Sequence, residues 1–164
     1  MHARVDQDLL LRFFLVFSAF EYALKSSGLF VRHKIEPPNF PNAEPAWDSF
    51  AVSLRGSFDL KSSPQLQVAC EYLLDSPPNH QVLTSTGIAW ETPIRSCSEK
   101  TDIEFLLRMI RCVRNNLFHG AKFNAGVHED KERAELLLRH SMTVLEACLD
   151  LAPDVNAAYA DAIL

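Results

Sequence analysis

The stretch from Asp6 to Ser27 limits the folds open to this chain most strongly. It is rich in Leu, Phe and Ala, contains no Gly or Pro, and is followed by Gly28, a pattern typical of a helix that ends at a glycine. Charged residues interrupt it, so it has no uncharged run of the about 20 residues that a membrane span needs. Its apolar side chains surround most of the helix, which must therefore be covered on more than one side. We expect one side to pack on the domain core and the other against a second subunit.

Composition fits a small domain without a targeting segment. The 164 residues, 48% hydrophobic and 23% charged, predict a single domain over residues 1–164. The first residues lack the basic start and cleavage site of a signal peptide, so we expect a cytoplasmic protein with no membrane partner. The four cysteines form no Cys-x-x-Cys pair, which argues against a zinc cluster and fits reduced thiols. The net charge of −5 gives no general attraction for nucleic acid, so any RNA contact must be local.

The rest of the chain predicts further helices separated by breaks, which together make an all-α helical bundle of four to six helices. The segment Asn79–Ser98 is ambiguous and is either a small hairpin insertion or an ordered loop. Pro153 interrupts the closing helix, and Asp154 is a candidate cap for a last short helix. The expected elements after the first helix are a Pro-rich loop over Gly28–Pro45, helices over Ala46–Arg55 and Pro64–Leu74, the ambiguous segment, and helices over Thr101–Leu117 and from Val127 to about Leu151.

The helix over Thr101–Leu117 has one apolar and one polar face. At about 100° per residue, Arg114 projects near the margin of the apolar stripe, where a purely solvated arginine is not expected. Arg114 and His119 lie about 140° apart on an ideal helix. Their side chains meet only if the helix end distorts, if the arginine wraps around, or if a dimer joins two copies. The polar face carries Glu104, Arg108, Arg111, Asn115 and His119.

The run Val113-Arg114-Asn115-Asn116-Leu117-Phe118-His119-Gly120 resembles the Arg-x4-6-His signature of HEPN domains, in which a polar residue, often Asn, follows the arginine. The order of elements is also similar to that superfamily. The resemblance implies a HEPN-like bundle that forms a homodimer and acts as a metal-independent RNA endonuclease without a cofactor, in a toxin–antitoxin or anti-phage system. It also implies an antitoxin or other regulatory protein partner. Toxins paired with a nucleotidyltransferase antitoxin carry a tyrosine two residues after the histidine, whereas Ala121 stands here, so control by modification of that tyrosine is not supported.

The resemblance and the side-chain chemistry together assign roles. Histidine titrates near neutrality, so His119 is the expected general acid/base, and arginine presents a charged planar fork, so Arg114 is the expected transition-state clamp. Asn115 is the expected orienting group. No metal is expected, because the histidines show no ligand spacing. The residues assigned to substrate binding are Arg108, Arg111 and Asn116.

Other interpretations of the same residues stay open. His119-Gly120 is also an ordinary helix C-terminus, and Arg108 and Arg111 could form a solvated face paired with Glu104. Glu21 could reach Arg114 or pair with Lys25. The alternative functions are a non-catalytic HEPN module that binds a nucleotide or serves as a scaffold, and a plain helical dimerisation subunit. A nuclease assay distinguishes these alternatives, because only the enzyme would cleave RNA.

Overall fold

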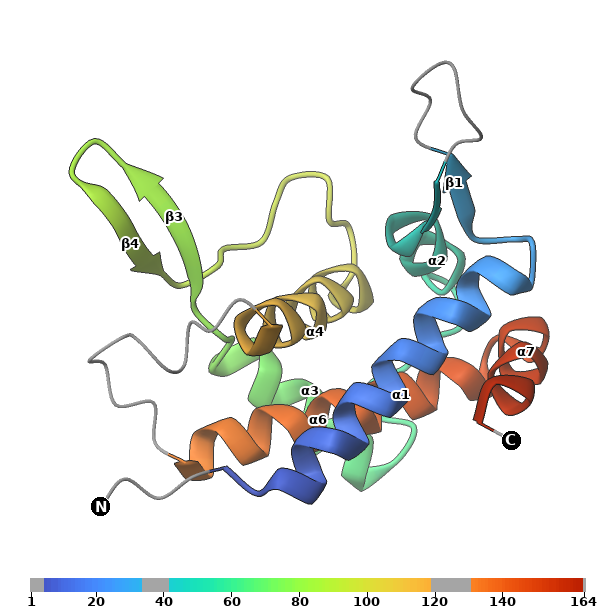
Figure 1. Ribbon diagram of the computed structural model, residues 1–164. Coiled ribbons are helices and arrows are strands. Elements are labelled where there is room, and N and C mark those ends of the chain that lie inside the picture. Colours follow the sequence, from blue (N-terminus) through green and yellow to red (C-terminus); the bar gives the residue numbers. More distant parts are fainter. Residues whose placement is uncertain (1–4, 34–41, 119–130, 164) are drawn as a thin grey trace.

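The fold was taken from a computed structural model, which describes residues 5–33, 42–118 and 131–163. These residues form six helices and two small two-stranded sheets, so the prediction of a helical bundle is confirmed and the fold is not strictly all-α. Figure 1 shows α1 crossing α6, with α4 on the side of the bundle that carries the β3–β4 hairpin. The elements are α1 (Gln7–Ser26), β1 (Val31–His33), β2 (Ala43–Pro45), α2 (Trp47–Ser53), α3 (Pro64–Asp75), β3 (His80–Thr84), β4 (Gly87–Glu91), α4 (Asp102–Phe118), α6 (Lys131–Asp150) and α7 (Pro153–Ile163).

Helix α1 has the boundaries that its sequence predicts. The Asp6 carboxylate caps its start by accepting from the backbone N–H groups of Asp8 and Leu9. Gly28 follows its end with a φ of +74°, a left-handed conformation that costs glycine little. One face of α1 is buried against α6 and α7. Another face, with Leu11, Phe14 and Leu15, is exposed in the described residues.

The core lies where α1, α2, α3, α4 and α6 meet. Trp47 of α2 stacks on Phe17 and on Phe20 of α1, with ring centroids 5.4 and 5.3 Å away. Leu106 and Ile110 of α4 are fully buried, as their spacing on one helix face predicts. Burial of many large side chains around one centre supplies the main stabilising term of such a domain. The core therefore fixes α4, which carries the candidate site, against α2, α3 and α6.

Two β-hairpins interrupt the helices. The prediction that Gly28–Pro45 is a loop is wrong at its ends, because Val31–His33 pairs antiparallel with Ala43–Pro45. Phe30 packs on Phe50 at 5.1 Å beside this ladder, and Pro45 is tolerated at the end of an edge strand. In the ambiguous segment, β3 and β4 pair in register from His80–Glu91 to Thr84–Gly87. This hairpin projects from the helices in Figure 1.

Smaller differences concern the last two helices. Helix α6 begins at Lys131 among the described residues, and the predicted start at Val127 lies outside them. Asp154 lies in the first turn of α7 and is not its cap, because the helix begins at Pro153. In the described part of the chain no helix is long and apolar enough to cross a membrane.

Candidate active site at the end of helix α4

Arg114 lies in the last turns of α4, where this helix meets α1. Its guanidinium carbon sits 4.7 Å from the ring centroid of Phe118 and 5.8 Å from that of Phe17 in α1. Phe118 in turn contacts Phe14 of α1, with centroids 5.4 Å apart. Aromatic faces attract a cation, so these rings hold the half-buried arginine at the seam between the two helices. This explains why an arginine can stand at the margin of the apolar stripe.

The polar contacts of Arg114 set it apart from the other arginines of this face. Its Nη1 donates to Asn115 Oδ1 at 3.1 Å, and within the described residues no carboxylate pairs with it. A guanidinium has five N–H donors, so most of them remain for an anion such as a phosphate. Asn115 is exposed and touches the arginine directly. The arrangement can orient Arg114 toward a ligand at the end of α4.

The predicted partner of Arg114, His119, lies outside the described residues, and so do Gly120 and Ala121. The structure therefore gives no distance between the two proposed catalytic side chains. Asn116, which was assigned to substrate binding, uses its Nδ2 to donate to the Asn79 carbonyl oxygen at 2.7 Å. The Cys112 thiol contacts the same oxygen at 3.5 Å. These contacts tie α4 to the start of the β3–β4 hairpin.

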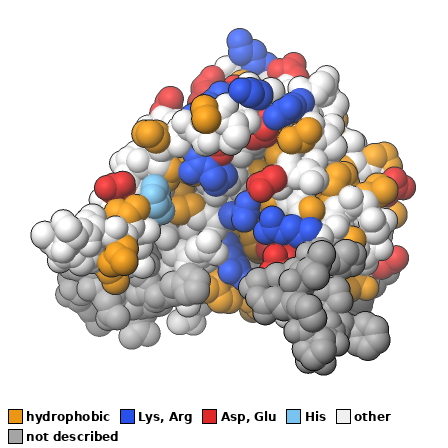
Figure 2. Space-filling model, turned by 90° about the horizontal axis from the view of Figure 1, so that it is seen from above, with side chains coloured by type: hydrophobic (Ala, Val, Ile, Leu, Met, Phe, Trp, Pro, Cys, Tyr) orange, Lys and Arg blue, Asp and Glu red, His pale blue; other side chains and the backbone are white. Residues whose placement is uncertain are grey.

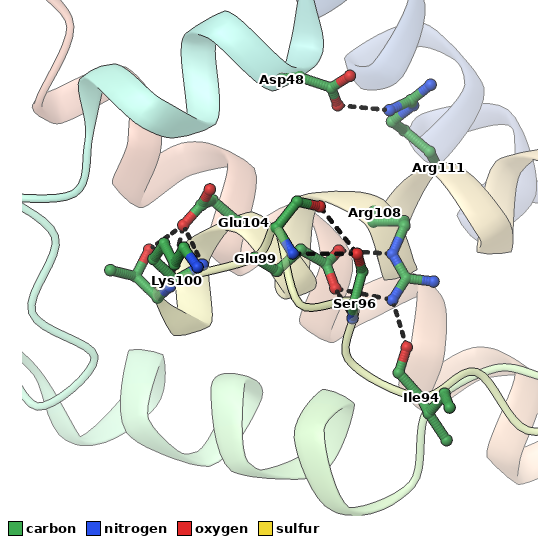
Figure 3. Close-up of polar contacts among 10 residues, drawn as sticks. Asp48, Ile94, Ser96, Glu99, Lys100, Glu104, Arg108 and Arg111 are labelled. Carbon is green, nitrogen blue, oxygen red and sulfur yellow. Dashed lines mark hydrogen bonds and ion pairs between the residues drawn. The ribbon is translucent and has the colours of Figure 1, made fainter.

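Arg108 forms the most extensive ion pair of the face, and Figure 3 shows it. Its Nε lies 2.5 Å from Glu99 Oε1, while its Nη2 lies 2.9 Å from Glu99 Oε2 and 2.7 Å from the Ile94 carbonyl oxygen. Burial raises the pKa of Glu99, but the hydrogen bonds from Arg108 and from the Ser96 backbone outweigh it and leave that pKa below its usual range. Arg108 thus fastens the loop before α4 to the helix.

Arg111 and Glu104 have partners that the sequence did not suggest. Arg111 Nη1 lies 3.4 Å from Asp48 Oδ1 of α2, a long contact to a side chain that is 85% exposed, and such pairs contribute little to stability. Glu104 pairs with Arg55, so the alternative in which Arg108 and Arg111 form a solvated face paired with Glu104 is wrong. Arg111 is therefore held less firmly than Arg108 and is free to contact a ligand.

Glu104 is the polar centre of the N-terminal end of α4. Its oxygens accept from Arg55 Nη2 at 2.6 Å and Nε at 3.1 Å, and from the backbone N–H groups of Lys100 and Thr101 at 2.9 Å each. The hydrogen bond from Arg55 is the largest cause that lowers the pKa of Glu104 to about 2, against a smaller opposing effect of burial. The sequence did contain a signal for part of this cluster, because Thr101-x-x-Glu104 is a capping box. Its partner Arg55 lies 49 residues away and could not be predicted.

Glu21 also takes a partner that was not considered. Its Oε1 accepts from Trp47 Nε1 at 3.1 Å, and within the described residues no ion pair joins it to Lys25 or Arg114. This hydrogen bond satisfies the indole N–H of a tryptophan that is otherwise buried in the core. Glu21 therefore positions Trp47, and it does not extend the candidate site.

An apolar stripe on α1 lies beside Arg114. Leu11 and Leu15 are 57% and 55% exposed, and Phe14 between them is 41% exposed. Phe118, half exposed itself, joins this stripe to the arginine through its contacts with Phe14 and Arg114. The second apolar side of α1 is thus open in the described residues, and its cover by a second subunit stays a prediction.

Neither metal ligands nor known relatives add to this site. Among the residues that the structure describes, no group of three or more His, Cys, Asp or Glu side chains could hold a metal ion. The chain matches no family model, no curated protein and no solved structure. The site must therefore be interpreted from its own chemistry.

Proposed function

We propose that this chain is a metal-independent endoribonuclease of the HEPN type, with Arg114 and His119 as its catalytic residues. The observation that supports this most is the state of Arg114. Aromatic rings hold its guanidinium at the seam of α1 and α4, and no carboxylate neutralises it within the described residues. An arginine held in this way suits the charge of a phosphate better than it suits a structural ion pair.

The chemistry that we propose uses the RNA's own 2′-hydroxyl. Its oxygen attacks the adjacent phosphorus, a base removes its proton, and the bond from phosphorus to the 5′-oxygen breaks as that oxygen takes up a proton. The products are a 2′,3′-cyclic phosphate and a 5′-hydroxyl. His119 transfers protons, since imidazole titrates near neutral pH. Arg114 stabilises the charge that gathers on the phosphoryl oxygens, and Asn115 orients the guanidinium through their hydrogen bond.

The proposal includes a homodimer in which two copies bring their α4 ends together. The exposed apolar stripe of Leu11, Phe14 and Leu15 supports it, because it continues through Phe118 to Arg114. A partner copy that covered this stripe on α1 would therefore also lie close to Arg114. Sedimentation velocity tests this: Leu15→Asp should yield a monomer, whereas Val68→Asp, at a side chain of α3 that is 57% exposed, should not. A wild-type monomer would contradict the dimer.

The biological role that we propose is that of a toxin or an anti-phage effector controlled by a protein partner. A free nuclease would harm the cell, so a neutralising or activating partner is expected. The β3–β4 hairpin supports such docking, because its cross-strand partners Leu83 and Ile88 are 85% and 71% exposed. Exposed apolar pairs of this kind are typical of interaction surfaces.

The chemical test is cleavage of an RNA pool by purified protein in EDTA. We expect cleavage that survives chelation, leaves 2′,3′-cyclic phosphate ends, and stops at any position where the RNA carries a 2′-deoxy sugar. Products with 5′-phosphate ends, or cleavage beside a 2′-deoxy sugar, would refute this mechanism because neither can arise from attack by the 2′-oxygen. Absence of cleavage would favour the second candidate, a dimerisation module, for which the exposed stripe on α1 is the supporting observation.

A further inference from the structure

A pocket with a volume of about 450 Å³ opens at the N-terminal end of α4, the opposite end from Arg114. Three cationic side chains line it, from three different segments: Arg55 after α2, Arg95 in the loop after β4, and Lys100 just before α4. The half-buried Phe58 forms part of its wall. The volume lies in the range of small-ligand sites in proteins.

Carboxylates hold the two arginines of this pocket without covering them. Glu104 binds Nε and Nη2 of Arg55, but the Glu104 side chain is only 9% exposed whereas that of Arg55 is 37% exposed. The guanidinium therefore lies outward of its carboxylate, and within the described residues its Nη1 has no partner. Arg95 is held by Asp102 through Nη2 and lies 5.7 Å from the Phe105 ring centroid, which leaves Nε and Nη1 for a ligand. Arginines fixed in this way lose little entropy on binding an anion.

The side chains of the pocket suit a phosphate group with a nucleoside attached. Two planar guanidinium groups and an ammonium group match phosphate oxygens, and an aromatic wall can take the face of a base. The remaining acidic side chain, Asp59, is exposed and accepts from the Lys61 backbone N–H. The attraction of these three cationic side chains for a phosphate is local, so it is compatible with the net charge of −5 of the whole chain.

The pocket and the candidate active site lie at opposite ends of α4. From Asp102 to Arg114 the helix rises about 18 Å, at about 1.5 Å per residue. A stacked strand that advances about 3.4 Å per nucleotide covers this length with about five nucleotides. Arg108 and Arg111 project between the two ends. Figure 2 shows Lys and Arg side chains as a broken band that runs from the upper edge of the molecule down to its middle, with acidic side chains among them.

We propose that this pocket binds a backbone phosphate of the RNA, about five nucleotides from the phosphate at Arg114, so that the strand runs along α4. The proposal rests on the function proposed above, because it takes RNA as the substrate. It adds Arg55, Arg95 and Lys100 to the residues that contact this substrate.

The test measures binding of a labelled 2′-O-methyl RNA of about 12 nucleotides, long enough to reach both ends of α4. This strand cannot be cleaved by attack of its 2′-oxygen, so binding is measured apart from catalysis. The variants are Arg95→Gln and Lys100→Gln, whose side chains are exposed. Arg55 is left intact because its loss would leave the half-buried Glu104 carboxylate without its ion-pair partner. The matched control is Arg139→Gln, an exposed arginine of α6. Fluorescence anisotropy is recorded from about 50 to about 200 mM salt, and melting curves establish that each variant is folded.

Each lost phosphate contact should weaken binding about fivefold at 0.1 M salt and lower the slope of log affinity against log salt by about 0.7. The control should change neither quantity. Failure of the wild type to bind the strand, or slopes unchanged in Arg95→Gln and Lys100→Gln, would overturn the proposal. A third result would also overturn it: the pocket binds adenosine monophosphate, but the variants bind the RNA strand as tightly as the wild type does. The pocket would then be a site for free nucleotides.

This result can be separated from failure of the proposed function. Reduced slopes in a protein that cleaves no RNA would support the pocket and refute the nuclease. Cleavage that depends on Arg114, together with unchanged slopes in the pocket variants, would refute the pocket and leave the nuclease standing.

Discussion

Replacing Glu104 by Gln should destabilise the protein because one carboxylate, whose side chain is only 9% exposed, joins three segments. Glu104 Oε1 accepts from Arg55 Nη2, and its Oε2 accepts from Arg55 Nε, from the Lys100 and Thr101 backbone N–H groups, and from Thr101 Oγ1. Glutamine keeps one acceptor oxygen but places an amide N–H₂ where the other oxygen stood. That group meets the Nη2 donor of Arg55, so a charged hydrogen bond is replaced by two facing donors.

The expected loss is about 2 kcal/mol of unfolding free energy, since a hydrogen bond between charged groups contributes about 1.5–3 kcal/mol and the one from Arg55 Nη2 is lost. For a domain of this size that corresponds to a melting temperature lower by about 4–8 °C. The effect should depend on pH. The pKa of Glu104 lies at about 2 in the folded protein and at 4.5 for the free side chain, so its contribution is present above about pH 5 and is lost as the pH falls toward 2.

Urea unfolding of the wild type and of Glu104→Gln, measured at about pH 7 and about pH 3, tests this account. The control is Glu146→Gln, which removes an exposed carboxylate 4.0 Å from Arg12 and should change stability by less than about 0.5 kcal/mol. The difference in unfolding free energy between the wild type and Glu104→Gln should be smaller at about pH 3 than at about pH 7. Equal stabilities at pH 7, or a difference that grows on acidification, would refute the role of the carboxylate.

Three further predictions follow from burial and backbone geometry. A thiol reagent should modify the exposed Cys97 in the native protein but reach Cys70 and Cys148 only after unfolding, because burial covers both thiols, raises the pKa of Cys70 to about 12 and also raises that of Cys148; native modification of all three would contradict this. Gly28→Ala should lower the unfolding free energy by about 1–2 kcal/mol, as measured by urea titration, because its φ of +74° disfavours a Cβ; an unchanged value would be the opposing result. Asn116→Ala should cost about 1 kcal/mol of stability yet leave RNA cleavage nearly unchanged, and a cleavage defect in a stable variant would show a role in binding substrate.

The helices could be predicted because their signals are local. Asp6 and Gly28 bound α1, Ser63 caps α3 through its side chain, and the apolar stripe of α4 gave the face that is buried. The first hairpin was missed, because its prolines predict a loop while the short strands beside them depend on packing against Phe50. Propensity gave no information on that contact.

The candidate site could be predicted only in part. The position of Arg114 near the apolar margin was visible on the helix wheel, but its contact with Phe17 depends on how α1 crosses α4. The ion pairs of Arg108 and Arg55 were missed for a related reason, since their carboxylates come from a loop and from another helix. Contacts between distant segments follow from the tertiary fold and leave no spacing in the sequence.

The central claim is that Arg114 and His119 cleave RNA without a metal. Its most direct test is the single-turnover rate constant of RNA cleavage in EDTA for the wild type, Arg114→Ala, His119→Ala and the control Arg139→Ala. The account predicts that the first two variants fold normally and lose at least about 100-fold in rate, while the control matches the wild type. A rate above about a tenth of the wild-type value in either catalytic variant would contradict the assignment.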